Sequence, residues 1–193
     1  MTLILASSSP IRRQLLQSAG IAFEAAAPDV DEAAIKAEGC DPATISRELA
    51  EAKAGSIALM RPGDWVIGSD SAVSVDGELF SKPADRRAAA DHLRRFSGKA
   101  MRLTSAVALA RGDAVEWSQV DEAILHVRDL GDEFINAYLD AEWPEVGYCV
   151  GVFRMEGRGV QLFDRIEGDY FTILGMPLLP LLGALRDRGL IER

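Results

Sequence analysis

Three serines and two arginines stand close together near the start of the chain, in the segment S-S-S-P-I-R-R at residues 7–13. An apolar run precedes this segment and an amphipathic pattern follows it, so it joins the end of a strand to the start of a helix. The N-terminus of a helix favours an anion, and arginine binds phosphate oxygens through paired hydrogen bonds. The segment therefore predicts a phosphate site. The alternative is a capped helix with solvated arginines, and the spacing is not that of a Walker A loop.

Acidic residues supply the second group of candidates. Asp70 lies within the otherwise apolar strand pattern of residues 65–75. A carboxylate is costly to bury alone, so it is expected to face a cleft, a metal or a cation, unless it only stabilises a bend. Asp29, Asp31 and Glu32 form an acidic cluster. Oxygen ligands of this kind suit Mg²⁺ or Mn²⁺, although a solvated acidic loop is the alternative.

Lysine is rare in this chain, which has 17 arginines but only four lysines. Lys53 lies in a predicted helix and Lys82 directly precedes a proline. Each also fits an exposed ion pair or a surface charge. Glu156 lies in a glycine-punctuated loop that either contacts a ligand or only turns the chain. None of the three predicts a function by itself.

Several classes of protein are disfavoured by what the sequence lacks. A net charge of −9 repels nucleic-acid backbones, and no apolar run approaches the ~20 residues that span a membrane. The first residues do not have the pattern of a signal peptide, so Cys40 and Cys149 are expected to be free thiols in a reducing cytoplasm. Motifs of serine–histidine catalysis and of zinc hydrolysis are missing.

The elements that must position these residues follow from periodicity and turn signals. Strands and helices alternate without a repeating βαβ unit, which favours a mixed sheet in an α/β fold. A hairpin is expected at Asp76-Gly77 and an irregular connector at 28–40. No linker divides the chain, so we expect one domain over residues 1–193, built as two lobes around a cleft. Strands are predicted at 3–6, 21–26, 65–75, 102–110, 115–128, 146–152 and 160–163, and helices at 10–19, 41–59, 85–96, 132–141 and after 177.

Taken in order, the motifs of this chain resemble the Maf (septum formation inhibitor-like) family of nucleoside triphosphate pyrophosphatases. The matching stretches are L-A-S-S-S-P-I-R-R-Q-L-L at 5–16, P-D-V-D-E at 28–32, V-I-G-S-D-S at 66–71, S-K-P at 81–83 and I-E-G-D-Y-F-T-I-L-G-M-P-L at 166–178. The resemblance implies a Maf/ITPase-like α/β fold, with a mixed twisted sheet, flanking helices and two lobes around a deep cleft. It further implies a cytoplasmic enzyme, commonly a homodimer, that hydrolyses the α–β phosphate bond of a nucleoside triphosphate to a monophosphate and diphosphate.

The resemblance also implies roles for particular residues. Asp70 matches the catalytic acid, and Asp70 and Glu32 are the expected ligands of a divalent metal, Mg²⁺ or Mn²⁺. Whether Asp70 takes a proton from water or chiefly holds the metal stays open. The positions that match phosphate-binding residues are Ser7, Ser9, Arg12, Arg13, Lys53 and Lys82.

The choice of base is expected to depend on Ile11, Ser71 and Glu156. Pyrimidine-type members usually carry Arg, Thr and Gln there, and the 7-methyl-GTP type an aromatic residue, Gln and Glu. This chain departs from both at Ile11 and Ser71 and agrees with the 7-methyl-GTP type at Glu156, so we expect 7-methyl-GTP to be preferred. The alternatives are a dTTP/UTP pyrophosphatase, a non-catalytic nucleotide-binding regulator of cell division and, third, another phosphate-handling enzyme such as a kinase.

Overall fold

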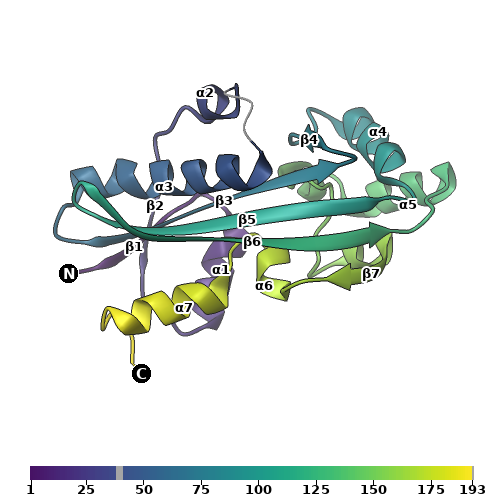
Figure 1. The fold of residues 1–193 in the computed structure, drawn as a ribbon. Helices are drawn as coiled ribbons and strands as arrows, with labels where there is room; N and C mark the ends of the chain where they lie inside the picture. Colours follow the sequence, from purple (N-terminus) through teal and green to yellow (C-terminus); the bar gives the residue numbers. More distant parts are fainter. Residues whose placement is uncertain (38–40, 193) are drawn as a thin grey trace. The chain divides into compact units, whose positions relative to one another are not determined.

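The computed structural model describes residues 1–37 and 41–192, and these form a mixed α/β fold (Figure 1). Within the described chain a seven-stranded sheet has the order β2-β1-β3-β5-β6-β7, and β4 pairs with β3. The β1 pairings with β2 and β3 are parallel, whereas β3–β4 and β6–β7 are antiparallel. The predicted mixed sheet with flanking helices is therefore confirmed.

The elements have the following bounds. The strands are β1 (Leu3–Ala6), β2 (Glu24–Ala26), β3 (Trp65–Val75), β4 (Glu78–Phe80), β5 (Ala100–Arg111), β6 (Ala114–Val127) and β7 (Phe163–Glu167). The α-helices are α1 (Pro10–Ser18), α2 (Glu32–Ala37), α3 (Pro42–Met60), α4 (Arg86–Phe96), α5 (Asp132–Glu142), α6 (Tyr170–Ile173) and α7 (Leu178–Asp187). Two 3₁₀ helices are η1 (Glu145–Tyr148) and η2 (Arg158–Leu162).

The chain divides into two compact units. The first unit contains residues 1–71, 104–122 and those from Asp169 onward, and the second contains residues 72–103 and 123–168. The prediction of one domain with two lobes around a deep cleft stays a prediction.

In the first unit, the core lies on both faces of the strands (Figure 1). Side chains alternate along a strand, so Val66 packs on one face with α3 while Ile67 packs on the other with α1 and α7. Burying each large aliphatic side chain stabilises the fold by about 1.5–3 kcal/mol. The face toward α3 is rich in alanine, which lets that helix come close to the strands.

The backbone of α3 comes close to β3 at Gly68. A Cβ atom built there would lie 2.0 Å from the carbonyl oxygen of Ala50 and 2.6 Å from the backbone nitrogen of Ala54. Both of these atoms belong to the α3 backbone, so neither can turn away as a side chain could. Only glycine allows α3 and β3 to pack at this separation.

The second unit contains the predicted hairpin and the capped helix α4. Asp76 and Gly77 have φ values of 52° and 80°, the conformation of a tight turn between β3 and β4. The Asp85 carboxylate accepts a hydrogen bond from the Ala88 N–H and caps α4, as its position predicted.

Three stretches differ from the sequence-based expectations. Residues 32–37 of the expected connector form α2, and residues 38–40, with the predicted free thiol of Cys40, lie outside the described residues. The expected strands at 146–152 and 160–163 are wrong, because residues 146–148 belong to η1 and residues 160–162 to η2; only Phe163 lies in a strand, as the first residue of β7. A short apolar run satisfies a strand pattern and a single buried helical turn equally well, which explains the error.

Gly68→Ala is expected to destabilise the protein by about 3 kcal/mol, because its methyl group would overlap the backbone of α3. Gly55→Ala is the matched control, since it lies within α3 and its Cβ would meet no atom within 4 Å. The control should be neutral or stabilising by up to about 1 kcal/mol. Urea unfolding monitored by circular dichroism measures both changes. Equal stability of the two variants would contradict the tight α3–β3 contact.

Candidate functional site

Lys53 is the centre of a charged cluster in the first unit. Its Nζ lies 2.5 Å from Asp70 Oδ1 and 2.7 Å from Glu32 Oε1. Lys53 and Asp70 are 7% and 8% exposed, whereas Glu32 is half-buried. The three side chains come from α3, β3 and α2, so the fold brings together three residues that the sequence singled out separately.

The charge state of this cluster follows from its contacts. Burial of the Glu32 carboxyl opposes its ionisation, but the hydrogen bond and charge of Lys53, assisted by Lys36, outweigh this effect and lower the pKa to about 2. Glu32 is therefore ionised at neutral pH. The cluster then contains two carboxylates that share one ammonium.

Arg12 in α1 is hydrogen-bonded to the residues on both sides of Asp70. Its Nη1 donates to the Ser69 carbonyl at 2.8 Å and its Nη2 to Ser71 Oγ at 3.0 Å. Its Nε donates to the Gly175 carbonyl at 2.9 Å. Burial lowers the pKa of Arg12 below its ordinary value, while the charges of Asp70 and Glu32 act in the opposite direction.

The serine-rich segment forms the turn into α1. Ser7 is buried, and its Oγ accepts a hydrogen bond from the Ser9 N–H at 3.2 Å. Ser9 occupies the predicted N-cap position, but its hydroxyl makes no capping bond to the helix. Arg13 is exposed and donates to the Ser7 carbonyl at 3.5 Å, while Ile11 is half-buried. This turn therefore keeps a hydroxyl, a cation and the start of a helix together.

The remaining predicted residues lie in the second unit. Lys82 is exposed just after β4, and Glu156 lies in the turn before η2, where its carboxylate accepts a hydrogen bond from Arg154 Nε at 3.4 Å. The thiol of Cys149 lies near all three charges. Burial and the Glu156 charge, partly offset by Arg154 and Lys82, raise its pKa to about 11.

Sequence reasoning missed the polar residues on the face of β3 opposite the Asp70 side chain. Ser105 on β5 is fully buried, and its Oγ donates to the Thr172 carbonyl at 2.8 Å. Gly175 has a positive φ of 97° and accepts from several of these groups. A signal for Ser105 was present, because a serine inside the apolar strand pattern stands out as Asp70 does.

The donor set is compatible with a divalent cation. Glu32 and Asp70 present carboxylate oxygens to a common cation, the Lys53 ammonium. Mg²⁺ is usually bound by one or two carboxylates together with water and substrate phosphates. Among residues 1–37 and 41–192, no group of three or more His, Cys, Asp or Glu side chains could hold a metal by itself. Two carboxylates completed by a phosphate ligand therefore fit this structure better than an all-protein metal cage.

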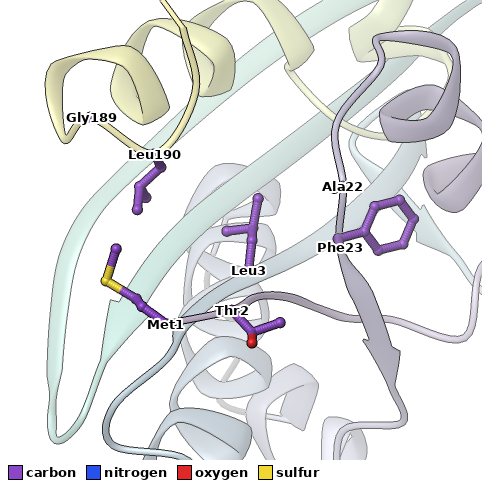
Figure 2. A pocket seen from close by; sticks show the side chains of 7 residues that line it. All are labelled: Met1, Thr2, Leu3, Ala22, Phe23, Gly189 and Leu190. Atoms are coloured by element: carbon purple, nitrogen blue, oxygen red, sulfur yellow. The ribbon is translucent and has the colours of Figure 1, made fainter.

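A cavity of about 440 Å³ lies elsewhere in the first unit (Figure 2). None of its lining residues has an ionisable side chain: Met1, Thr2, Leu3, Ala22, Phe23, Gly189 and Leu190. Over the described part of the chain, no helix is both long and apolar enough to cross a membrane.

Comparison with known proteins identifies the family. The sequence matches the profile of Maf-like proteins over residues 2–188. A 7-methyl-GTP pyrophosphatase of Rhizobium meliloti is 48% identical over 194 residues, which cover 98% of each chain. A nucleoside triphosphate pyrophosphatase of Sphingopyxis alaskensis is 49% identical over 195 residues, again 98% of each chain. This chain belongs to the Maf-like protein family, as its motifs predicted.

Among solved structures, a HAM1 protein from Coxiella burnetii is similar over 65% of this chain and 72% of that chain. The TM-score is 0.45 and the sequence identity 15%. The family assignment depends on the sequence relatives alone.

The raised pKa of Cys149 predicts slow alkylation of the folded protein at pH 8. With a pKa of about 11, only about one thiol in a thousand is ionised at that pH, and the thiolate is the reactive form. The rate should rise about tenfold per pH unit between pH 8 and 10, whereas urea-unfolded protein should approach its plateau near pH 9. Mass spectrometry of the iodoacetamide-labelled peptide measures both rates. Parallel pH curves in the two states would contradict the prediction.

Proposed function

We propose that this chain is a nucleoside triphosphate pyrophosphatase. It hydrolyses the bond between the α and β phosphates and releases a nucleoside monophosphate and inorganic diphosphate. The proposal depends on the Glu32–Lys53–Asp70 cluster, in which a carboxylate oxygen of Glu32 and one of Asp70 each lie within 2.7 Å of the Lys53 ammonium. The printed names of the relatives from Rhizobium meliloti and Sphingopyxis alaskensis agree with it.

The basic residues serve the phosphate chain. A triphosphate carries several negative charges, and attack by water places more charge on phosphorus. Cations aimed at this charge lower the barrier most where water is scarce. Lys53 is buried next to the acid, and Arg13 is exposed at the turn that contains Ser7 and Ser9. Lys82 adds a further cation, so the net charge of −9 is no obstacle to binding a polyanion.

Asp70 is the proposed catalytic carboxylate. Its carboxylate is buried, ion-paired and flanked by residues that Arg12 holds. An ionised carboxylate in such a place is able to accept a proton from an attacking water molecule. The Lys53 ammonium at 2.5 Å offsets the cost of burying that charge.

Glu32 and Asp70 are also the proposed ligands of Mg²⁺ or Mn²⁺. When bound, such an ion polarises phosphoryl oxygens and offsets negative charge on them. Both carboxylates contact the Lys53 ammonium, whose charge offsets the repulsion between them. Asp70 Oδ1 is held by Lys53 at 2.5 Å, and the Asp70 carboxylate would be placed to bind the ion or to accept a proton from water.

For the base, we propose 7-methyl-GTP, with dTTP or UTP as the alternative. A carboxylate accepts hydrogen bonds from the N–H edge of guanine, and methylation makes the base cationic, which strengthens the attraction. Glu156 provides such a group on an exposed turn, where it is held by Arg154. The relative at 48% identity carries this activity in its name.

We also propose that the enzyme works as a homodimer in the cytoplasm. Light scattering of the purified protein tests the dimer.

The experiment that tests the function is diphosphate release from a panel of nucleotides in the presence of Mg²⁺. The panel contains 7-methyl-GTP, GTP, UTP, dTTP and ATP. Release of diphosphate together with a monophosphate supports the proposal, and release of inorganic phosphate alone contradicts it. Tight nucleotide binding without turnover would instead favour a regulator that keeps only the binding cleft.

Asp70→Asn should lower kcat by about a hundredfold or more, because the amide neither accepts a proton as a base nor provides a full charge. Asp113→Asn, on the exposed turn between β5 and β6, is the matched control and should keep kcat. Circular dichroism checks that both variants are folded. Near-normal turnover of a folded Asp70→Asn protein would remove Asp70 from its role.

Glu156→Gln should lower kcat/KM for 7-methyl-GTP by about 10- to 100-fold, because a charged acceptor is lost and a mismatched donor is introduced. Activity on UTP and dTTP should fall less or rise. Glu133→Gln, exposed in the first turn of α5, is the control. An equal loss on all nucleotides would show that Glu156 supports the fold and does not read the base.

A further inference from the structure

A chain of hydrogen bonds connects α1, β3, β5 and α6 on the face of β3 opposite the Asp70 side chain. Ser71 Oγ lies 2.9 Å from Ser105 Oγ, and Ser105 Oγ lies 2.8 Å from the Thr172 carbonyl. Arg12 Nη2 donates to Ser71 Oγ at 3.0 Å. All four residues belong to the first unit.

The direction of this chain follows from the available protons. A carbonyl only accepts a hydrogen bond, so Ser105 must donate its single hydroxyl proton to the Thr172 carbonyl. The Ser105 oxygen is then an acceptor for the hydroxyl proton of Ser71, whose own oxygen accepts from Arg12. Each bond polarises the next, so the chain is fixed in one direction from the guanidinium to Thr172.

A second set of bonds converges on the Gly175 carbonyl. It accepts from Arg12 Nε at 2.9 Å and lies 3.0 Å from Ser69 Oγ and 3.2 Å from Ser71 Oγ. Ser69 Oγ has a single proton, and the Ala106 carbonyl at 2.8 Å is the nearer of its two acceptors. The two residues that flank Asp70 are thus both anchored, in a region where their side chains are buried or nearly so.

We propose that Arg12 and Ser105 are positioning residues that act through the backbone on either side of Asp70. This inference rests on the proposed function. Successive side chains of a strand point to opposite faces, so Ser69 and Ser71 anchor β3 on one face while Asp70 meets Lys53 on the other. The anchors hold the Asp70 backbone in place without contacting its carboxylate.

This role differs from the phosphate-binding role that the resemblance implies for Arg12. Arg12 has five N–H donors, and three of its bonds go to groups of the protein. Arg13, one position further, has only a long bond of 3.5 Å to a carbonyl and is exposed. Of the two guanidinium groups, that of Arg13 is therefore the more available to bind a substrate phosphate.

The proposal is tested by comparing Ser105→Ala with Ser46→Ala. Ser46 is an equally buried serine that donates to the carbonyl of Thr104, next to Ser105 in the chain, but it has no bond to the anchored residues. Each variant loses one buried hydroxyl. We expect Ser105→Ala to lower kcat by about tenfold with KM changed by less than about twofold, and Ser46→Ala to keep both within about twofold.

Arg12→Lys is the second variant, and it keeps the charge but loses the three-bond geometry. It should lower kcat at least as much as Ser105→Ala, with little change in KM, whereas Arg13→Lys should mainly raise KM. The double variant Arg12→Lys with Ser105→Ala should lose less than the product of the two single effects, because both act on one chain of bonds.

Two outcomes overturn the proposal. A kcat for Ser105→Ala equal to that of Ser46→Ala would show that the chain of bonds does not position Asp70. A raised KM with normal kcat in Arg12→Lys would return Arg12 to phosphate binding. Inactivity of the wild type on every nucleotide would overturn the proposed function itself and this role with it, and that result is distinct from the other two.

Discussion

The close contact between α3 and β3 is the constraint on which the candidate site depends. Glycine at position 68 leaves bare backbone on the strand, and the helix turns opposite it carry only the small side chains of Ala50 and Ala54. At this separation the Lys53 side chain reaches Asp70, two residues further along β3, with an N–O distance of 2.5 Å. A larger side chain at Gly68 would move α3 away and separate the ion pair, although it would change no residue of the cluster. Packing between small residues therefore determines the geometry of the charges.

The charged cluster is better explained by a role in binding and catalysis than by a contribution to the stability of the fold. Burying the charges of Lys53 and Asp70 is costly, and buried ion pairs are often no more stabilising than apolar residues of the same size. Lys36 also pairs with Glu32 at 3.1 Å, but it is exposed, so the buried part of the cluster is the Lys53–Asp70 pair. The carboxylates of Glu32 and Asp70 suit a site that receives a metal together with a phosphate chain, in which further cations balance the phosphates.

Sequence patterns predicted elements where a single local signal was decisive. The apolar run of β3 agrees with the expected bounds 65–75, and Asp85 caps its helix as expected because the capping geometry is local. The same patterns predicted Asp70 as an acid inside an apolar strand. They failed for η1 and η2, where a few apolar residues fit a strand or a helical turn equally well. They also could not assign the bonds of Arg12, whose acceptors lie 57, 59 and 163 residues away in the chain.

The two faces of β3 divide the work of the site between them. Val66 and Asp70 face α3, and Ile67 and Ser69 face the side of α1 and of the turn before α7. Since side chains alternate, a slip of β3 by one residue would exchange these faces and place the carboxylate among apolar groups. The hydrogen bonds at Ser69 and Ser71 fit only one register, so they act against such a slip at the point where it would do most harm. The serine hydroxyls on the α1 face of β3 are thus as necessary to the proposed chemistry as the charges on the α3 face, because they determine which face the Asp70 side chain occupies.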